Sequence, residues 1–404
     1  MSVAAPVRPA HRDPNALRWV AGYLSSLIGD QVWFVALGWA AVQAGSAAQV
    51  GGVLAAGALP RAVLLVLGGA LADRWGPRRT ALGSDAARTA LLLCGTAAVL
   101  LLPPSVLVLA VLAGAFGAVD AVYLPAASAM PPQLVAPDQV LRLTGMRGTV
   151  QRLATTLGAP VGGLVVAAAG AGVGLVVAAG ATALSVLALL ATRVRPVEPV
   201  QRKPLWHEVR AGLAHVARSP VLRSLLLLAA VSEFAFSGSL NVGVPLLAAH
   251  RGWGAGGIGV LLGALGGGAT VGTLGLVLVR RVPHVGRLFL PLVVLMGAGL
   301  VGLGLVPSLL GAAALAAVVG AGGGVSGSLF GALFLTESPP DMVARVSSLA
   351  MLAFFGLAPV AYALAGLAAA VAGPSTPFVL GGGICVLAGA VTLAPALRRV
   401  ELPA

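Results

Sequence analysis

Four ionisable residues lie inside long apolar segments of this sequence: Asp30, Arg61, Asp120 and Glu233. A charged side chain at the centre of a bilayer costs roughly 2.5–3.5 kcal/mol on insertion scales, so such groups face one another or water. A carboxylate in this setting can bind and release a proton, or it can neutralise a cationic ligand. We therefore predict that these four residues couple proton movement to the protein's function. The alternative for each of them is a structural ion pair or a packing contact.

Arg61 needs an anionic partner, because its guanidinium does not lose its proton. We expect Asp30, on the neighbouring segment, as the first choice and Asp120 as the second. A persistent Asp30–Arg61 pair would keep the carboxylate ionised and unable to carry a proton, unless a ligand separated the two. A structural pair and a coupling switch are both open at this stage. Asp85 and Arg88, one helical turn apart at the start of a later segment, predict an ion pair at the membrane surface.

The segments that carry these charges are predicted to span a membrane. Hydrophobic residues make up 58% of the chain and charged residues only 9%, whereas soluble proteins contain about 25% charged residues. Apolar runs of about 20 residues match the thickness of a bilayer. We predict an all-α membrane protein with twelve transmembrane helices, at 17–42, 49–72, 80–102, 105–130, 146–170, 172–193, 221–248, 255–280, 287–306, 308–336, 345–372 and 376–397.

The placement of arginine predicts the orientation and the domains. Arginines fall in alternate loops, and the opposite set of loops contains only Arg251. By the positive-inside rule, both termini then face the cytoplasm. A polar linker with helical spacing of its apolar residues predicts an amphipathic helix on the membrane surface, with a solvated linker as the alternative. The predicted parts are an N-terminal tail (1–16), a six-helix bundle (17–193), the linker (194–220), a second six-helix bundle (221–397) and a C-terminal tail (398–404).

Several functional classes are excluded by the same composition. The formal net charge of +13 resides in short loops and leaves no basic face, so we expect no nucleic-acid partner. Cys94 and Cys385 lie in separate apolar segments and indicate neither a disulfide framework nor a metal site. The sequence contains no Walker loop, nucleophile elbow or metal-ligand cluster. We therefore expect no enzyme activity, no cofactor and no bound metal.

A charged loop between the second and third segments carries Gly69, Asp73, Arg74, Gly76, Arg78 and Arg79. Its pattern, Gly-x-Leu-Ala-Asp-Arg-x-Gly-x-Arg-Arg, resembles the signature loop between helices 2 and 3 of the major facilitator superfamily. The resemblance implies twelve helices in two pseudo-symmetric six-helix bundles. It also implies that Asp73 and the neighbouring arginines form a latch between the bundles at the cytoplasmic face. The alternative is a positively charged stop between two spans.

The fifth segment contains Gly158, Pro160, Gly162 and Gly163. They are similar to the Gly-Pro-x-x-Gly-Gly element of exporters in this superfamily, with the proline shifted by one position. In that family the element bends helix 5 against helix 8, and a glycine-rich stretch at 263–268 would supply the partner here. Generic glycine packing is the alternative. With Ser26-x-x-Gly29-Asp30 and Leu59-Pro60-Arg61, the element makes the chain resemble bacterial exporters of drugs, macrolides and siderophores.

The resemblance implies a substrate cavity between the two bundles, lined by helices 1, 4, 7 and 10. Aromatic walls suit flat hydrophobic molecules, and Asp30 or Glu233 would favour cations. The residues expected to line the cavity are Tyr23, Ser26, Trp33, Tyr123, Ser237, Asn241, Phe330, Phe334 and Phe355.

The function implied by the resemblance is proton-coupled export of an amphipathic small molecule, a drug or a natural product, by alternating access. We expect a monomer in the plasma membrane of a bacterium, with the substrate, protons and the lipid bilayer as its partners. Flipping of a lysophospholipid by the same fold is the alternative function. A membrane sensor that does not transport is a third.

Overall fold

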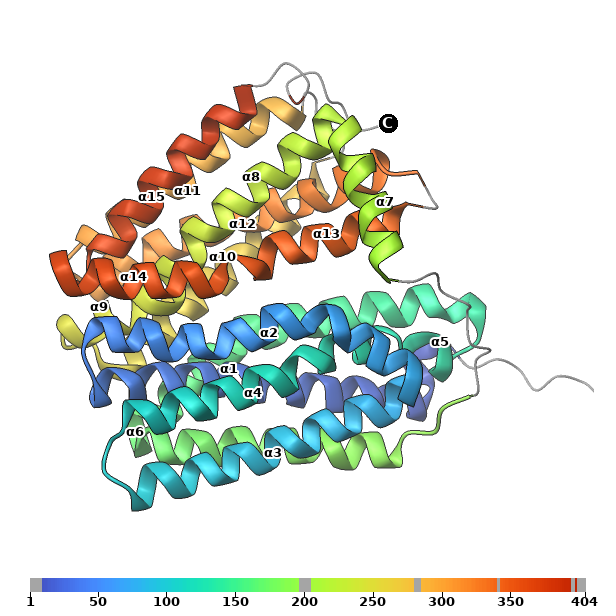
Figure 1. Cartoon of the computed structure of the whole chain (residues 1–404), viewed down its shortest axis with the longest axis horizontal. Coiled ribbons are helices and arrows are strands. Elements are labelled where there is room, and N and C mark those ends of the chain that lie inside the picture. Colours follow the sequence, from blue (N-terminus) through green and yellow to red (C-terminus); the bar gives the residue numbers. More distant parts are fainter. Residues whose placement is uncertain (1–8, 196–204, 280–284, 340–341, 394–396, 398–404) are drawn as a thin grey trace, which may run out of the picture.

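The described part of the chain consists of helices and the loops between them, without a strand (Figure 1). The computed structural model describes residues 9–195, 205–279, 285–339, 342–393 and 397. Within these ranges the side chains of 66–70, 72–73, 205–209, 211, 343–345 and 347–348 are excepted.

The N-terminal half contains six membrane crossings in five long helices. The last of these helices is broken at Gly170, whose φ of 82° and ψ of 171° are not helical and suit glycine. This break divides it into two crossings that run in opposite directions. The helices of this half are α1 (Pro14–Ala44), α2 (Ala47–Trp75), α3 (Pro77–Leu101), α4 (Val106–Ser128), the short α5 (Pro131–Leu134) and α6 (Val140–Ala191).

The C-terminal half repeats this arrangement with more interrupted helices. One crossing consists of α8 (Pro220–Ser237), a π-helical segment (Gly238–Gly243) and α9 (Val244–His250). Another consists of α13 (Val343–Gly356) and α14 (Ala358–Ala372), which meet at Leu357. The remaining helices are α7 (Leu205–Arg218), α10 (Gly254–Leu278), α11 (Val285–Leu305), α12 (Leu309–Thr336) and α15 (Thr376–Ala388), followed by a 3-10 turn (Gly389–Leu393).

The predicted fold class is confirmed. Eleven described helical segments are long and apolar enough to cross a membrane, and the segment 137–191 holds the Gly170 break and counts twice. In Figure 1 the two halves form separate bundles, one above the other, which approach each other on the side of α9 and diverge on the side of α5 and α7.

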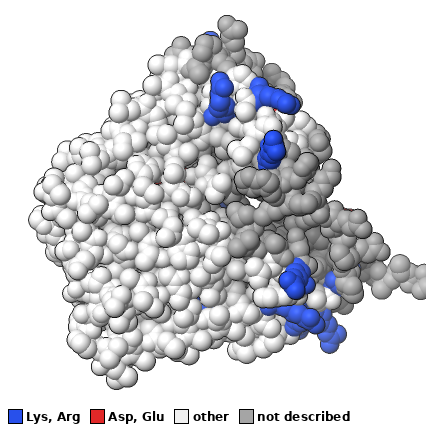
Figure 2. All heavy atoms as spheres, in the orientation of Figure 1, with Lys and Arg blue, Asp and Glu red and all other residues white. Residues whose placement is uncertain are grey.

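Exposed arginines gather at one end of the molecule, where α5 and α7 lie, and we call this the basic end (Figure 2). The opposite end in this view is uncharged. The described arginines that are exposed near helix termini or on α7 include Arg12, Arg74, Arg79, Arg142, Arg193, Arg210, Arg218, Arg223 and Arg287.

Glycines allow the two halves to approach closely. The contacts between halves are made mainly by α2 with α14 and by α6 with α10. A Cβ at Gly51 would lie 2.8 Å from the Gly366 Cα, and one at Gly163 would lie 2.6 Å from the Gly259 Cα. Close approach of helix backbones through small residues is a main source of helix association in lipid. The interface between the halves therefore depends on these positions.

We expect Gly163→Leu to destabilise the protein, because the new side chain would collide with the backbone of α10. Overpacking of this kind costs typically 1–3 kcal/mol. The measurement is thermal unfolding in detergent. Gly180→Leu is the control on the same helix, since a Cβ there meets nothing within 4 Å. Equal melting temperatures for the two variants would contradict the close packing of α6 against α10.

Candidate functional site

A fully buried arginine, Arg88, organises the polar interior of the N-terminal half. Its Nη1 donates to Asp30 Oδ1 at 2.7 Å and to Asp120 Oδ1 at 3.0 Å. Its Nη2 donates to Asp85 and to the Ser26 hydroxyl, the latter at 2.7 Å. One guanidinium thus holds three carboxylates that come from α1, α3 and α4.

Aromatic rings enclose this guanidinium. Arg88 Cζ lies 4.1 Å from the centroid of the Tyr123 ring and 6.0 Å from that of Phe116. The Trp33 ring stacks on Phe116 at 4.6 Å between centroids, and Tyr23 stacks on Tyr123 at 6.3 Å. These aromatic side chains are buried, as is Ser26. Four residues predicted to line a cavity, Tyr23, Ser26, Trp33 and Tyr123, therefore form packed walls around Arg88.

The predicted ion pair between Asp85 and Arg88 is present, but its predicted place at the membrane surface is wrong, because both side chains are fully buried. The helix that carries them begins at Pro77, so Arg88 lies roughly 16 Å along the helix axis, near mid-membrane. Asp85 also accepts hydrogen bonds from Ser26 at 3.0 Å and from Ser185 at 2.6 Å. The sequence does indicate this burial, because α3 has one polar face within an apolar helix, formed by Ser84, Asp85, Arg88 and Thr89.

Arg61 pairs with Asp120 and not with the first choice, Asp30. Its Nε lies 3.1 Å from Asp120 Oδ2. The reason is the packing of α2 on α4, where a Cβ at Gly117 would collide with the Gly57 carbonyl. This close approach lies one turn from both charged residues and brings them together. Asp30 is instead bound by Arg88.

These five residues form what we call the acid–arginine network: Asp30, Arg61, Asp85, Arg88 and Asp120. It contains three carboxylates and two guanidiniums, so with every group ionised it carries one net negative charge. Side-chain exposure is 16% for Asp30, 6% for Asp120 and zero for Asp85. Asp30 is therefore the most accessible carboxylate of the network.

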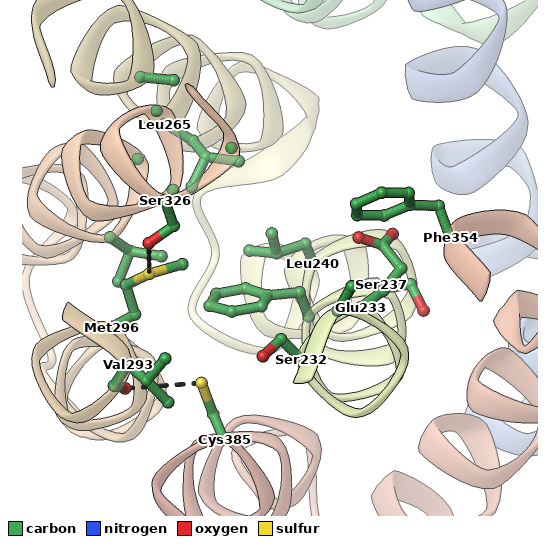
Figure 3. A pocket seen from close by; sticks show the side chains of 18 of the residues that line it. Ser232, Glu233, Ser237, Leu240, Leu265, Val293, Met296, Ser326, Phe354 and Cys385 are labelled. Carbon is green, nitrogen blue, oxygen red and sulfur yellow. Dashed lines mark hydrogen bonds between the residues drawn. The ribbon is translucent and has the colours of Figure 1, made fainter. Parts of the chain in front are cut away.

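The C-terminal half contains a cavity of about 340 Å³ (Figure 3). One wall comes from α8, which contributes Ser232, Glu233 and Ser237. Among the described residues Glu233 has neither a hydrogen-bond donor nor a cation as a partner, and the buried hydroxyls of both serines have no hydrogen-bond partner. The π-helical segment begins directly after this wall, and such segments occur often at functional sites. The cavity thus combines an unpaired acid with unsatisfied hydroxyl groups.

The cavity brings together part of the predicted set. Glu233, Ser237, Asn241 and Phe330 line it, whereas Phe334 packs behind Phe330 at 6.3 Å between ring centroids. The sequence did not single out several other lining residues, although Ser232 and Phe354 adjoin predicted positions in the chain. The lining residues missed include Ser232, Phe236, Met296, Phe354 and Cys385. All the residues that line the cavity belong to the C-terminal half.

Phe355 does not line the cavity but contacts the N-terminal half. The Arg61 Cζ lies 5.1 Å from the centroid of its ring, within cation–π distance. Arg61 is 23% exposed, more than any other member of the network. The contact therefore connects the acid–arginine network to α13 across the boundary between the halves.

The charged segment between α2 and α3 connects α3 to the end of α6, both in the N-terminal half. Gly76 has a φ of 84°, which favours glycine. Arg78 donates to the carbonyls of Leu189 and Leu190, each at 3.0 Å, where a cation is favourable at the C-terminal end of α6. Arg74 and Arg79 are exposed. The side chain of Asp73 and the surroundings of Gly69, both part of the predicted latch, lie outside the described residues.

The glycine–proline element of α6 has two faces. Gly158 and Gly162 pack against α1, at Gln31 and Val32, while Gly163 packs against Gly259 of α10. Pro160 lies against Gly263 of α10. Gly268, at the end of the predicted partner stretch, packs against Ala317 of α12 instead. The element therefore lies between a helix of its own half and a helix of the other half.

No group of histidine, cysteine or acidic side chains suited to a metal occurs among the described residues. The polar centres of the described part are thus the acid–arginine network and the cavity beside Glu233. Their acids can exchange protons or bind cations.

We expect Arg88→Ala to be strongly destabilising, because it would leave three buried carboxylates without their shared cation. Removing one partner from a buried ion pair costs about 3–5 kcal/mol. Thermal unfolding of the purified protein measures the effect, and Arg79→Ala, an exposed arginine on the same helix, is the control. A melting temperature for Arg88→Ala equal to that of the control would contradict the role of Arg88 as the centre of the network.

Comparison with known proteins gives consistent matches over most of the chain. The family model described as Major Facilitator Superfamily matches residues 19–363. The multidrug efflux pump Tap of Mycolicibacterium fortuitum is 28% identical over 401 residues, which cover 94% of this chain and 95% of that protein. The multidrug efflux pump Tap of Mycobacterium tuberculosis (strain ATCC 25618 / H37Rv) is 28% identical over 419 residues, which cover 98% of this chain and 97% of that protein.

Solved structures of transporters share the fold. A bacterial homologue of the human lysosomal transporter Spinster, in an inward-facing and unoccupied conformation, superposes with a TM-score of 0.71 at 16% identity, covering 95% of this chain and 96% of that one. The D-xylose–proton symporter gives a TM-score of 0.72 at 14% identity, and the superposition covers 96% of this chain and 99% of that one. At such identities the likeness concerns the fold alone.

Proposed function

Because the chain belongs to the Major Facilitator Superfamily and is a transporter, we propose that it exports amphipathic cationic small molecules in exchange for protons. The observation that carries this proposal is the cavity beside Glu233, where an unpaired carboxylate adjoins aromatic walls. The similarity to efflux pumps supports the direction of transport. Alternating access of the two halves to the two sides of the membrane would move the substrate.

The substrate would bind in the C-terminal half. Glu233 would neutralise a positive charge on the substrate, and the hydroxyls of Ser232 and Ser237 would accept hydrogen bonds from an ammonium group. Phe330 and Phe354 offer ring faces to an aromatic or aliphatic body. A cavity of about 340 Å³ falls at the lower end of the range for small-molecule sites. A compact monocation therefore fits this cavity better than a large glycoside.

Protons would bind in the N-terminal half, at the acid–arginine network. Three carboxylates share two guanidiniums there, so one proton removes the net negative charge. Asp30 is the accessible acid, and its protonation would leave Arg88 bound to Asp85 and Asp120. One elementary charge that crosses a potential of 100 mV gains about 2.3 kcal/mol. One or two protons per cycle would therefore sustain a useful substrate gradient.

The basic end would face the cytoplasm of a bacterium, because arginines mark the inner side of membrane proteins. The protein would act as a monomer in the plasma membrane. Flipping of a lysophospholipid gains no support from the comparisons, and we do not propose it.

We expect Asp30→Asn to abolish proton-driven efflux, because the amide cannot take up the proton. The measurement is efflux of a panel of compounds from cells, with and without an uncoupler. Asp138→Asn, an exposed acid outside the membrane helices, is the control and keeps wild-type efflux. Unchanged efflux in Asp30→Asn would remove Asp30 from the mechanism. Efflux that continues in the uncoupled wild type would exclude proton exchange.

We expect Glu233→Gln to weaken transport of cations more than transport of neutral compounds, because only cations would lose an ionic partner. A hydrogen bond or ion pair to a charged group is worth about 1.5–3 kcal/mol, so the KM for cations should rise at least tenfold. Glu337→Gln, at the end of α12, is the matched control. Equal losses for charged and neutral compounds would contradict charge recognition at Glu233.

A further inference from the structure

Two adjacent phenylalanines on α13 adjoin charged residues of different halves: one contacts a cation of the N-terminal half, and the other lines a cavity with an acid of the C-terminal half. Arg61 of α2 lies against the ring of Phe355, with 5.1 Å from Cζ to the ring centroid. Phe354 lines the cavity together with Glu233, whose carboxylate points toward it in Figure 3. Consecutive side chains on a helix point about 100° apart. The Phe354–Phe355 pair therefore contacts the guanidinium with one ring and the cavity of the carboxylate with the other.

The Glu233 carboxylate and the Arg61 guanidinium can each form further hydrogen bonds or ion pairs. Glu233 has no ionic partner among the described residues. Arg61 makes one ion pair, through Nε, with Asp120, which Arg88 also binds. A guanidinium has five N–H donors and suits bidentate pairing with a carboxylate. A Glu233–Arg61 pair would therefore satisfy both groups if the rings between them moved.

The helix is interrupted beside these rings at Leu357, which we take as a pivot. The α13 helix ends at Gly356, and α14 begins at Ala358 with Pro359 in its first turn. On the other side of the pivot, α14 is fixed to α2 by the contact of Gly366 with Gly51. A rotation of α13 about Leu357 would thus move the ring pair while α14 stays on α2.

We propose that Arg61 competes with the cationic substrate for Glu233. With substrate bound, Glu233 is neutralised by the substrate and Arg61 keeps the pair with Asp120 that the structure shows. When the substrate leaves, α13 moves the Phe354–Phe355 pair aside and Arg61 binds Glu233. This inference rests on the proposed function, since it assumes that a cation binds at Glu233.

Partner exchange by Arg61 would couple the two halves. When Arg61 leaves Asp120, the network keeps three carboxylates, Asp30, Asp85 and Asp120, and the single guanidinium of Arg88. Its net charge then falls from one negative to two negative, which favours the binding of one proton from water by a carboxylate. Return of Arg61 on binding of a cation releases that proton. One substrate cation and one proton therefore bind alternately, so the exchange ratio is one to one.

Binding of tetraphenylphosphonium to the purified full-length protein tests the competition. Arg61→Gln removes the competitor, so the affinity for this cation should rise about five- to tenfold. In the Glu233→Gln background the same change should have no effect, because the shared partner is absent. Arg142→Gln, an exposed arginine in the first turn of α6 and outside the latch, is the control. Where Arg61→Gln does not fold, Phe355→Ala replaces it and should lower the affinity, because the path from Arg61 to Glu233 is opened.

Proton release tests the coupling in the same preparation. Addition of tetraphenylphosphonium to the wild type in weakly buffered solution should release about one proton per bound cation, read with a pH dye. Arg61→Gln should bind the cation and release none. Equal binding by wild type and Glu233→Gln would contradict the cation site itself. Loss of binding in Glu233→Gln with unchanged affinity and proton release in Arg61→Gln would contradict the competition alone.

Discussion

The structure of the N-terminal half depends on the cost of burying charge in a medium that cannot solvate it. Arg88 is enclosed by protein, and three carboxylates converge on it from α1, α3 and α4. Each of these groups would be expensive alone, and they are tolerated because each supplies the counter-charge for another. The surrounding helices are held together by this requirement as well as by glycine contacts. The same requirement makes the network sensitive to any change in its number of protons.

The C-terminal half handles its one interior acid differently. Glu233 faces a cavity and lacks an ionic partner among the described residues. An acid without a counter-charge in such a place is a candidate site for a cation, which would come from a ligand or a side chain. The two halves thus differ in how they hold charge. The N-terminal half holds a network with one net negative charge, and the C-terminal half holds a carboxylate without a counter-charge among the described residues. Arg61 and the Phe354–Phe355 pair lie on the boundary between them.

Much of this arrangement was predictable from the sequence, because apolar length and arginine placement determine the crossings. The interior position of Asp30, Arg61, Asp120 and Glu233 followed in the same way. The pairing did not follow, since it depends on which helices touch: glycines let α2 approach α4, and Arg61 therefore meets Asp120. The burial of Arg88 was not predicted, because the helix was expected to begin at residue 80. It begins at Pro77, so Arg88 lies deeper in the membrane than expected. The cavity lies within one half because the aromatic residues of the other half pack around Arg88.

The most direct test of this division is a structure of the protein with a lipophilic cation bound, determined by cryo-electron microscopy with tetraphenylphosphonium. The account predicts the phosphonium in the cavity of the C-terminal half, between Glu233 and the rings of Phe330 and Phe354, with Arg88 still bound to the three carboxylates. A phosphonium beside Asp30 or Asp120 in the N-terminal half would contradict it.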